Sequence, residues 1–294
     1  MLVPLIPKLG AGGILFVVCG LSFMAASFFT PQPKLRIPVL LLAIVIAAIP
    51  FLKTKPFEFT PHMNKRFFRA LTKDKELHEA SYWDPVSKID IIRYPNHPRI
   101  KWIAYDGGTQ TSYFYEFDGD FNALRKALPQ KARNHFWGNI VLPSHFLKAD
   151  TNQEVLIIGS AGGQEAKAAL TYGAKHVDGI ELVGKVVELG KGDYSKFTGN
   201  IFNHPKVDIQ KGEGRSFLRS INKKYDIIQI MSNHTSSSIA AGSGAMSATY
   251  LQTVEAYQEY FTHLKDDGIL HINHHIYPRM VATAAKAWKA MGKD

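Results

Sequence analysis

Two runs of apolar residues open the sequence and predict membrane-spanning helices. Residues 10–29 carry no charge over about twenty positions, the length of a helix that crosses the hydrocarbon core of a bilayer. A shorter apolar run at residues 37–52 has Pro38 near its start and Pro50 near its end, where a missing backbone N–H is easiest to tolerate. The connector between the runs is rich in proline and basic residues. We therefore expect a transmembrane helical hairpin over residues 1–55.

The charges that follow this hairpin predict its orientation. The basic residues after the second run outnumber those of the connector and comprise Lys53, Lys55, Lys65, Arg66, Arg69, Lys73 and Lys75. Positive residues favour the cytoplasmic side, so we expect an inner or plasma membrane protein with its larger part in the cytoplasm. Residues 56–86 are assigned to a basic juxtamembrane linker, which either rests on anionic headgroups or is simply solvated. A cleaved signal peptide is the alternative, since Lys8 and small residues at 25–27 flank the first run.

The middle of the chain has the pattern of short antiparallel strands. Between residues 87 and 117, apolar and polar positions alternate around turn signals at residues 95–98 and 106–108. Residues 121–137 then show helical spacing that Pro129 should interrupt. The pattern predicts a small β-rich domain over residues 87–150.

From residue 151 to residue 294 strands and helices alternate. Apolar runs predict strands, and amphipathic segments predict the helices between them. The expected strands are 155–158, 176–181, 207–210, 226–231 and 269–273, and the expected helices are 164–172, 183–189, 215–220 and 247–264. Such alternation requires right-handed crossovers and gives an α/β fold with a doubly wound, Rossmann-like sheet.

Composition and charge narrow the possible partners. The single cysteine, Cys19, excludes a disulfide framework or a thiolate metal site within one chain. The net charge of +10 would suit nucleic acid, but much of it lies just after the apolar N-terminus. We therefore expect a lipid bilayer as a partner and no nucleic acid.

A glycine-rich turn follows the first strand of the α/β segment. Its residues are Gly159, Ser160, Ala161, Gly162 and Gly163. In a doubly wound sheet this turn lets a nucleotide-like ligand approach the backbone, although a tight strand-to-helix turn needs the same glycines.

Two carboxylates strengthen the prediction of an adenosyl ligand. Glu181 closes the second strand about twenty residues after the first glycine, where a carboxylate accepts ribose hydroxyls. The dinucleotide pattern G-x-G-x-x-G fails at Ala161 and Gln164. Glu213 follows the third strand, where it could hold an adenine amino group or simply cap the next helix.

These motifs carry a family resemblance over residues 87–265. The chain resembles the spermidine synthase-like branch of class I S-adenosylmethionine-dependent transferases, especially its membrane-fused members. The matching stretches are residues 105–110 (YDGGTQ), 155–163 (VLIIGSAGG), 204–207 (HPKV), 212–218 (GEGRSFL), 225–229 (YDIIQ) and 250–257 (YLQTVEAY).

The resemblance implies a cofactor, S-adenosylmethionine or its decarboxylated form, and a methyltransferase-type sheet. It implies that Glu181 holds the ribose, Glu213 the adenine side and the glycine turn the amino-acid tail or ribose, while Gln110 reaches in from a β-rich lid. The full expected cofactor-binding set is Gln110, Gly159, Ser160, Ala161, Gly162, Gly163, Glu181, Leu182, Glu213, Gly214 and Met231.

Two departures from the family pattern bear on the reaction. Polyamine synthases carry an amine-binding aspartate in the glycine turn where this chain has Gly162. After the fourth strand they carry an acidic motif where this chain reads Met231-Ser232-Asn233-His234. A protonated amine needs a carboxylate for capture and a base for activation, so aminopropyl transfer loses support. The sequence therefore favours a membrane-anchored methyltransferase acting on a small acceptor. The alternatives are a diverged polyamine synthase and a non-catalytic regulator that binds the nucleoside.

The candidate catalytic residues are His234 and Tyr250, near the carboxyl ends of the later strands. His234 suits proton transfer near neutrality, although a surface loop histidine is the simpler interpretation. We expect no metal site, because adjacent strand residues such as His274 and His275 point to opposite faces. The family fold normally adds two strands after the helix beginning near Pro278, so a partner protomer could cover an exposed sheet edge, which gives a possible homo-oligomer.

Overall fold

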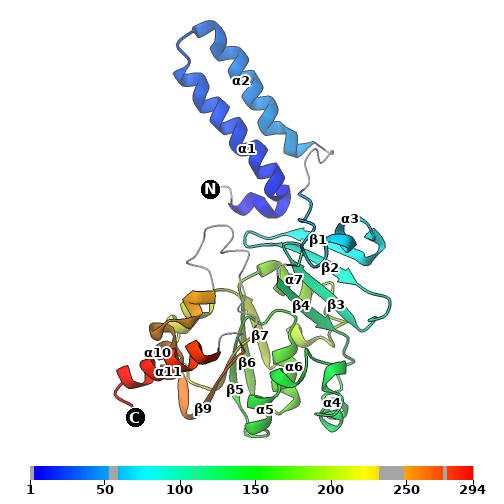
Figure 1. Cartoon of the computed structure of the whole chain (residues 1–294), viewed down its shortest axis with the longest axis vertical. Helices are drawn as coiled ribbons and strands as arrows, with labels where there is room; N and C mark the ends of the chain where they lie inside the picture. The colour runs from blue at the N-terminus through cyan, green and yellow to red at the C-terminus, as the bar shows by residue number, and fades with distance from the viewer. Residues whose placement is uncertain (1–2, 53–58, 109, 232–247, 274–276, 294) are drawn as a thin grey trace.

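The computed structural model describes residues 3–52, 59–108, 110–231, 248–273 and 277–293. Figure 1 shows a helical hairpin at one end, a small antiparallel sheet beneath it and an α/β domain beyond that sheet. The fold class predicted from the sequence, a Rossmann-like α/β sheet preceded by a small β-rich part, is confirmed.

The hairpin consists of α1 (Ile6–Phe29) and α2 (Pro33–Ala48), flanked by the short 3₁₀ turns η1 (Val3–Leu5) and η2 (Ile49–Phe51). The two helices pack closely at Gly20, where a Cβ would lie 2.6 Å from the Cβ of Ala47. Their outward faces are apolar and exposed, as at Ile37 and Leu41. By length and composition both helices could cross a membrane.

A kink interrupts α1 near its beginning. Gly10 has φ 68° and ψ 172°, which is not a helical conformation and which a residue with a side chain rarely adopts. The first turn of α1 therefore runs at an angle to the rest of the hairpin and lies over the small sheet (Figure 1).

The small sheet, which we call the lid sheet, contains β1 (His78–Trp83), β2 (Lys88–Arg93), β3 (Ile100–Tyr105) and β4 (Gln110–Tyr115) in that spatial order, all antiparallel. One face, including Ile91 and Phe114, packs into the core of the α/β domain. The other face packs against Phe67 and Ala70 from the region of α3 (Phe68–Thr72), which the turn η3 (Lys75–Leu77) connects to β1.

The lid sheet begins earlier than the sequence predicts. Helix α3 and strand β1 fall inside residues 56–86, which the sequence analysis assigns to a linker. Strand β1 alternates between half-buried and exposed positions, but its sequence HEASYW has few aliphatic residues. Its hydrophobic periodicity is therefore too weak to distinguish it from a polar connector.

A connecting region links the lid sheet to the α/β domain. Helix α4 (Phe121–Ala127) is capped by Asp120, whose carboxylate accepts the Ala123 N–H at 2.8 Å, and ends just before Pro129 as expected. It is followed by the turns η4 (Ala132–Asn134) and η5 (Asn139–Val141) and by the short helix α5 (Pro143–Leu147).

The described part of the α/β domain contains five parallel strands in the order β7-β6-β5-β8-β9. The strands are β5 (Glu154–Ile158), β6 (His176–Glu181), β7 (Val207–Lys211), β8 (Tyr225–Ile230) and β9 (Leu264–Ile272). Helices α6 (Gln164–Thr171), α7 (Gly184–Lys191), α8 (Gly214–Arg219), α10 (Val254–Thr262) and α11 (Tyr277–Ala290) lie between and after them, with the turns η6 (Ile201–Asn203) and η8 (Ala248–Gln252). Each strand and helix that the sequence predicts in this domain has a counterpart.

One predicted helix is divided. The sequence predicts a single helix over 247–264, whereas the described residues form η8 and then α10. The Thr253 hydroxyl accepts the Ala256 N–H at 3.2 Å and so caps a new helix start. Strand β9 accordingly begins at Leu264, earlier than the predicted residue 269.

Candidate functional site

The glycine turn lies at the carboxyl end of the central strand β5. Strand β5 has β6 on one side and β8 on the other, so the strand order reverses there. The Gly159 N–H donates to the Ile180 carbonyl at 2.8 Å, and Gly159, Ala161 and Gly163 have φ values of 83°, 38° and 80°. Such a switch point is where open α/β sheets bind their ligands.

Glu181 holds this turn to the end of β6. Its side chain is buried, and its two carboxylate oxygens accept the Ala161 N–H at 2.8 Å and the Val183 N–H at 2.9 Å. Burial raises the pKa of Glu181, and the two N–H donors oppose that rise. Each oxygen retains a lone pair that could accept a ribose hydroxyl. Ribose binding by Glu181 and the half-buried Leu182 stays a prediction.

Gly162 is in direct contact with the lid sheet. A Cβ at this position would lie 1.8 Å from the carbonyl oxygen of Tyr113 in β4, which is far inside the van der Waals limit. The absence of a side chain at residue 162 therefore has a physical cause, because strand β4 occupies the space that a side chain would need. An amine-binding acid cannot be built here while β4 stays where it is.

Glu213 caps the helix that follows β7. Its carboxylate accepts the N–H groups of Arg215 and Ser216 at 3.0 and 2.8 Å and the Ser216 hydroxyl at 2.9 Å. The capping role that the sequence left open is therefore present, and contact with adenine stays a prediction. Gly214 lies against Ile158 of β5, where a Cβ would come within 2.5 Å of Cγ2. The glycine lets α8 approach the central strand.

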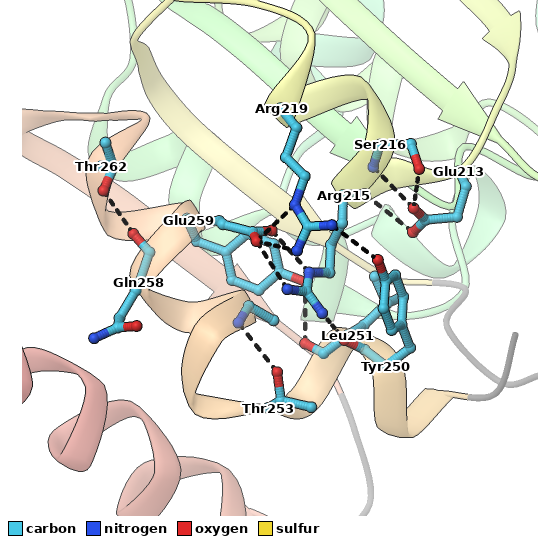
Figure 2. A network of polar contacts seen from close by, with 12 residues as sticks. Glu213, Arg215, Ser216, Arg219, Tyr250, Leu251, Thr253, Gln258, Glu259 and Thr262 are labelled. Carbon is cyan, nitrogen blue, oxygen red and sulfur yellow. Dashed lines mark hydrogen bonds and ion pairs between the residues drawn. The ribbon is translucent and has the colours of Figure 1, made fainter. Parts of the chain in front are cut away.

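A charged network connects α8 to α10 and η8 (Figure 2). The buried Arg215 donates from Nε and Nη2 to the carboxylate of Glu259 at 2.7 and 2.8 Å and from Nη1 to the Tyr250 carbonyl at 3.0 Å. Arg219 donates to the same carboxylate and, from Nη1, to the Tyr250 hydroxyl at 3.3 Å. The Arg215 guanidinium also lies 4.2 Å from the centre of the Tyr250 ring. The network fixes Tyr250 beside the helix that Glu213 caps.

The remaining predicted site residues are placed as follows. Gln110 begins β4 and pairs with Tyr105 across the lid sheet. Met231 follows β8, is buried, and donates its N–H to the Ile158 carbonyl at 3.4 Å. The predicted base His234 lies outside the described residues, as do His274 and His275. Within the described ranges, no three or more His, Cys, Asp or Glu side chains gather in a way that could hold a metal ion.

Two charged residues on α6, Glu165 and Lys167, are buried, and the sequence pattern does not indicate them. Burial raises the pKa of Glu165 to about 8 and lowers that of Lys167 to about 7. The Lys167 ammonium donates to the His135 carbonyl at 2.6 Å and lies 4.7 Å from the centre of the Phe136 ring. Charged residues in a short helix usually indicate a solvated face, so the sequence held no signal for their burial.

A second buried polar network, which the sequence pattern also does not indicate, joins α5 to the sheet. His145 donates from Nε2 to Gln229 Oε1 at 2.7 Å, and Gln229 Nε2 donates to the Val141 carbonyl at 3.0 Å and to His271 Nδ1 at 3.2 Å. Burial lowers the pKa of His145 to about 4. The network therefore holds His145 neutral at neutral pH.

The strand order, with a glycine turn and a buried carboxylate at its switch point, defines a Rossmann-like domain of the class that binds nucleotide-like ligands. Comparison with known families narrows this class. Residues 140–285 match the spermine/spermidine synthase domain. This part of the chain thus has a spermidine synthase-like fold of the class I S-adenosylmethionine type. The predicted resemblance to that branch is confirmed, whereas membership of its membrane-fused group stays a prediction.

Similar proteins carry names from the same family. A polyamine aminopropyltransferase of Clostridium perfringens is 32% identical over 127 residues, which are 43% of this chain and 41% of the relative. One of Alkaliphilus metalliredigens is 30% identical over 142 residues, or 48% of this chain and 46% of the relative. The matches thus span less than half the length of these relatives.

Among solved structures, the spermidine synthase from Thermotoga maritima aligns with 82% of this chain and 74% of its own, with 17% identity and a TM-score of 0.49. The fold assignment rests on the strand order and on the family match.

Proposed function

We propose that the protein is a membrane-anchored transferase that moves the aminopropyl group of decarboxylated S-adenosylmethionine to a small amine. The observation that carries the proposal is the buried Glu181 carboxylate clamped to the glycine turn at the switch point of the sheet. The family match and the names of the relatives support aminopropyl transfer over other reactions at the sulfonium.

When bound, the sulfonium cofactor supplies an electrophilic carbon, so the protein needs chiefly to align an acceptor in line with the breaking C–S bond. The acceptor nitrogen forms the new bond, a neutral thioether leaves, and the proton from the nitrogen passes to a base. Glu181 accepts the ribose hydroxyls, and the turn at residues 159–163 approaches the nucleoside with its backbone. Tyr250, fixed by Arg215 and Arg219, is the described side chain that we assign to the acceptor end.

Aminopropyl transfer needs a carboxylate near the transferred ammonium, and residue 162 cannot provide it. Glu165 lies in the first turn of α6, two residues after the glycine turn; it is buried, and its pKa is about 8 because burial disfavours its charged form. A neighbouring ammonium group would favour the ionised carboxylate and lower that pKa. Glu165 is therefore our candidate for the role that the sequence pattern leaves unfilled.

Methyl transfer is the second candidate. It is favoured by the contact between Gly162 and the Tyr113 carbonyl, which excludes the acid that captures an aminopropyl amine. The sequence alone favours methyl transfer, whereas the family match and the named relatives support aminopropyl transfer.

A product assay with purified full-length protein distinguishes these functions. We expect decarboxylated S-adenosylmethionine and putrescine to give spermidine and methylthioadenosine, detected by mass spectrometry. Formation of S-adenosylhomocysteine from S-adenosylmethionine and an acceptor would instead support methyl transfer. If calorimetry detects binding of neither cofactor nor of S-adenosylhomocysteine, the proposed cofactor site is wrong. Binding without either product would support a regulatory role.

The two N-terminal helices support the membrane anchor by length and composition. We test it by fractionating cells that express the full chain. Extraction from membranes by detergent but not by high salt supports spanning helices, and recovery in the soluble fraction contradicts them.

A further inference from the structure

The hairpin makes a close contact with the lid sheet. A Cβ at Gly10, the kink in α1, would lie 2.6 Å from Nε1 and 2.9 Å from Cδ1 of the Trp83 indole. Trp83 is the last residue of β1, so the end of this strand packs directly on the helix backbone. The Trp83 indole therefore occupies the space that a side chain at residue 10 would need, so this contact requires glycine.

The residue after Trp83 reaches the α/β domain. Asp84 is buried, and its carboxylate accepts the Val86 N–H at 2.9 Å and the Lys185 N–H at 3.0 Å. The first of these bonds shapes the turn between β1 and β2, and the second satisfies a free N–H in the first turn of α7. The same side chain thus joins the hairpin-facing turn of the lid sheet to the helix that follows β6.

The first turn of α7 is continuous with the cofactor site. Helix α7 begins at Gly184, directly after Val183, whose N–H donates to Glu181 at 2.9 Å. Asp84 is also close enough to Glu181 for its negative charge to raise the pKa of that carboxyl. Contacts therefore run from Gly10 through Trp83 and Asp84 to Glu181.

We propose that the N-terminal hairpin is a positioning element of the cofactor site. The contact at Gly10 fixes the position of Trp83 and of the adjacent Asp84. Asp84 in turn fixes the start of α7, and thereby the position of Glu181. Trp83 and Asp84 are positioning residues in this proposal, since neither is assigned to contact the ligand. The alternative is that the hairpin only tethers a self-sufficient soluble domain. The inference rests on the proposed function for the identity of the ligand.

The test uses full-length protein in detergent micelles and measures the affinity for S-adenosylhomocysteine by calorimetry. We expect Trp83→Ala and Asp84→Ala each to weaken binding about tenfold, because both changes free the start of α7. Asp84→Asn retains an oxygen that can accept the Lys185 N–H but loses the acceptor for the Val86 N–H, so we expect its affinity to lie between those of Asp84→Ala and the unchanged protein. Leu41→Ala, at an exposed position of the hairpin, is the matched control and should bind like the unchanged protein.

Measuring the affinity for S-adenosylhomocysteine over a range of pH distinguishes an effect on Glu181 from a general loss of folding. Three titratable groups face Glu181. The charge of Asp84, which follows β1, raises the pKa of Glu181, and Glu181 in turn raises the pKa values of Glu165 on α6 and Tyr105 on β3. Removing the Asp84 charge lowers the Glu181 pKa, so in Asp84→Asn the loss of affinity on acidification should move to lower pH. A purely structural change would leave that midpoint in place.

The outcomes are distinguishable. Affinities of Trp83→Ala and Asp84→Ala equal to that of Leu41→Ala would overturn this inference while leaving the proposed function intact. Failure of the unchanged protein to bind the ligand would overturn the proposed function itself. If the alanine variants do not fold, an unshifted pH midpoint in Asp84→Asn still overturns the inference, because Asp84 would then have no influence on Glu181, and a shifted midpoint supports the step from Asp84 to Glu181.

Discussion

Replacing Glu259 by glutamine tests whether the network of Figure 2 holds α8 to α10. The Arg215 side chain is only 4% exposed and that of Glu259 is 19% exposed. The change removes the charge from the partner of the buried guanidinium and leaves the Tyr250 carbonyl as its other acceptor. Breaking a fully buried pair costs about 3–5 kcal/mol. Because some water reaches Glu259, we expect a loss of about 2–4 kcal/mol, or a fall in Tm of about 5–12 °C.

The matched control is Glu116→Gln. The Arg99–Glu116 pair has a similar distance of 3.1 Å, but both side chains are about half exposed, at 52% and 51%. Such pairs contribute about 0–1 kcal/mol. Thermal unfolding of both variants in the same detergent gives the comparison. Equal shifts in Tm would refute the reasoning, because they would mean that burial of Arg215 adds nothing to the cost of losing its partner.

The same variant has an expected pH dependence. Burial opposes ionisation of Glu259, but hydrogen bonds from Arg215 and Arg219 outweigh it and lower its pKa. A carboxyl whose pKa is lower in the folded state contributes stability above its unfolded pKa of about 4.5, and that stability is lost as pH falls through the folded value. The difference between the variant and the unchanged protein should therefore be full at pH 7 and shrink below about pH 4.5. A difference that persists at pH 3 would contradict an electrostatic origin.

Gly162, Glu181 and His145 each give a further test. Gly162→Ala should destabilise the protein by about 1–3 kcal/mol, because its methyl group would displace the Tyr113 carbonyl; unchanged thermal unfolding would contradict the contact between β4 and the turn. Glu181→Gln should retain the fold but weaken binding of S-adenosylhomocysteine at least tenfold in calorimetry, and equal affinity would remove Glu181 from the site. Burial lowers the pKa of His145 to about 4, so its NMR signals should not titrate between pH 5 and 8, and the folded state should lose stability as pH falls from about 6.5 towards 4; a midpoint near 6.5 would contradict its burial.

The α/β domain could be predicted from the sequence because its signals are local. The uninterrupted apolar run at 155–158 is typical of a buried parallel strand, and it forms β5 between two neighbours. The glycine turn and Glu181 meet as expected, since the carboxyl ends of adjacent parallel strands lie at one edge. Strand β1 escaped prediction because its stabilising contacts come from distant segments and leave little periodicity in its own residues.

The polar networks could not be predicted for a related reason. His145 meets Gln229, and Arg215 meets Glu259, across long sequence separations that depend on how helices cross the sheet. A single sequence gives no pairing information between such residues. The role of Glu213 could not be predicted either, because a carboxylate at this position can cap a helix or bind a ligand. The sequence pattern alone does not distinguish these two roles.

The contact between Gly162 and Tyr113 constrains how this chain could change over evolutionary time. A single codon change could introduce aspartate at residue 162, but the new side chain would meet the backbone of β4 before it could meet any amine. Strand β4 would first have to move away from the turn, through substitutions elsewhere in the lid sheet. An acid at residue 162 could therefore be acquired only after other substitutions, and the first of these would have to lie outside the glycine turn.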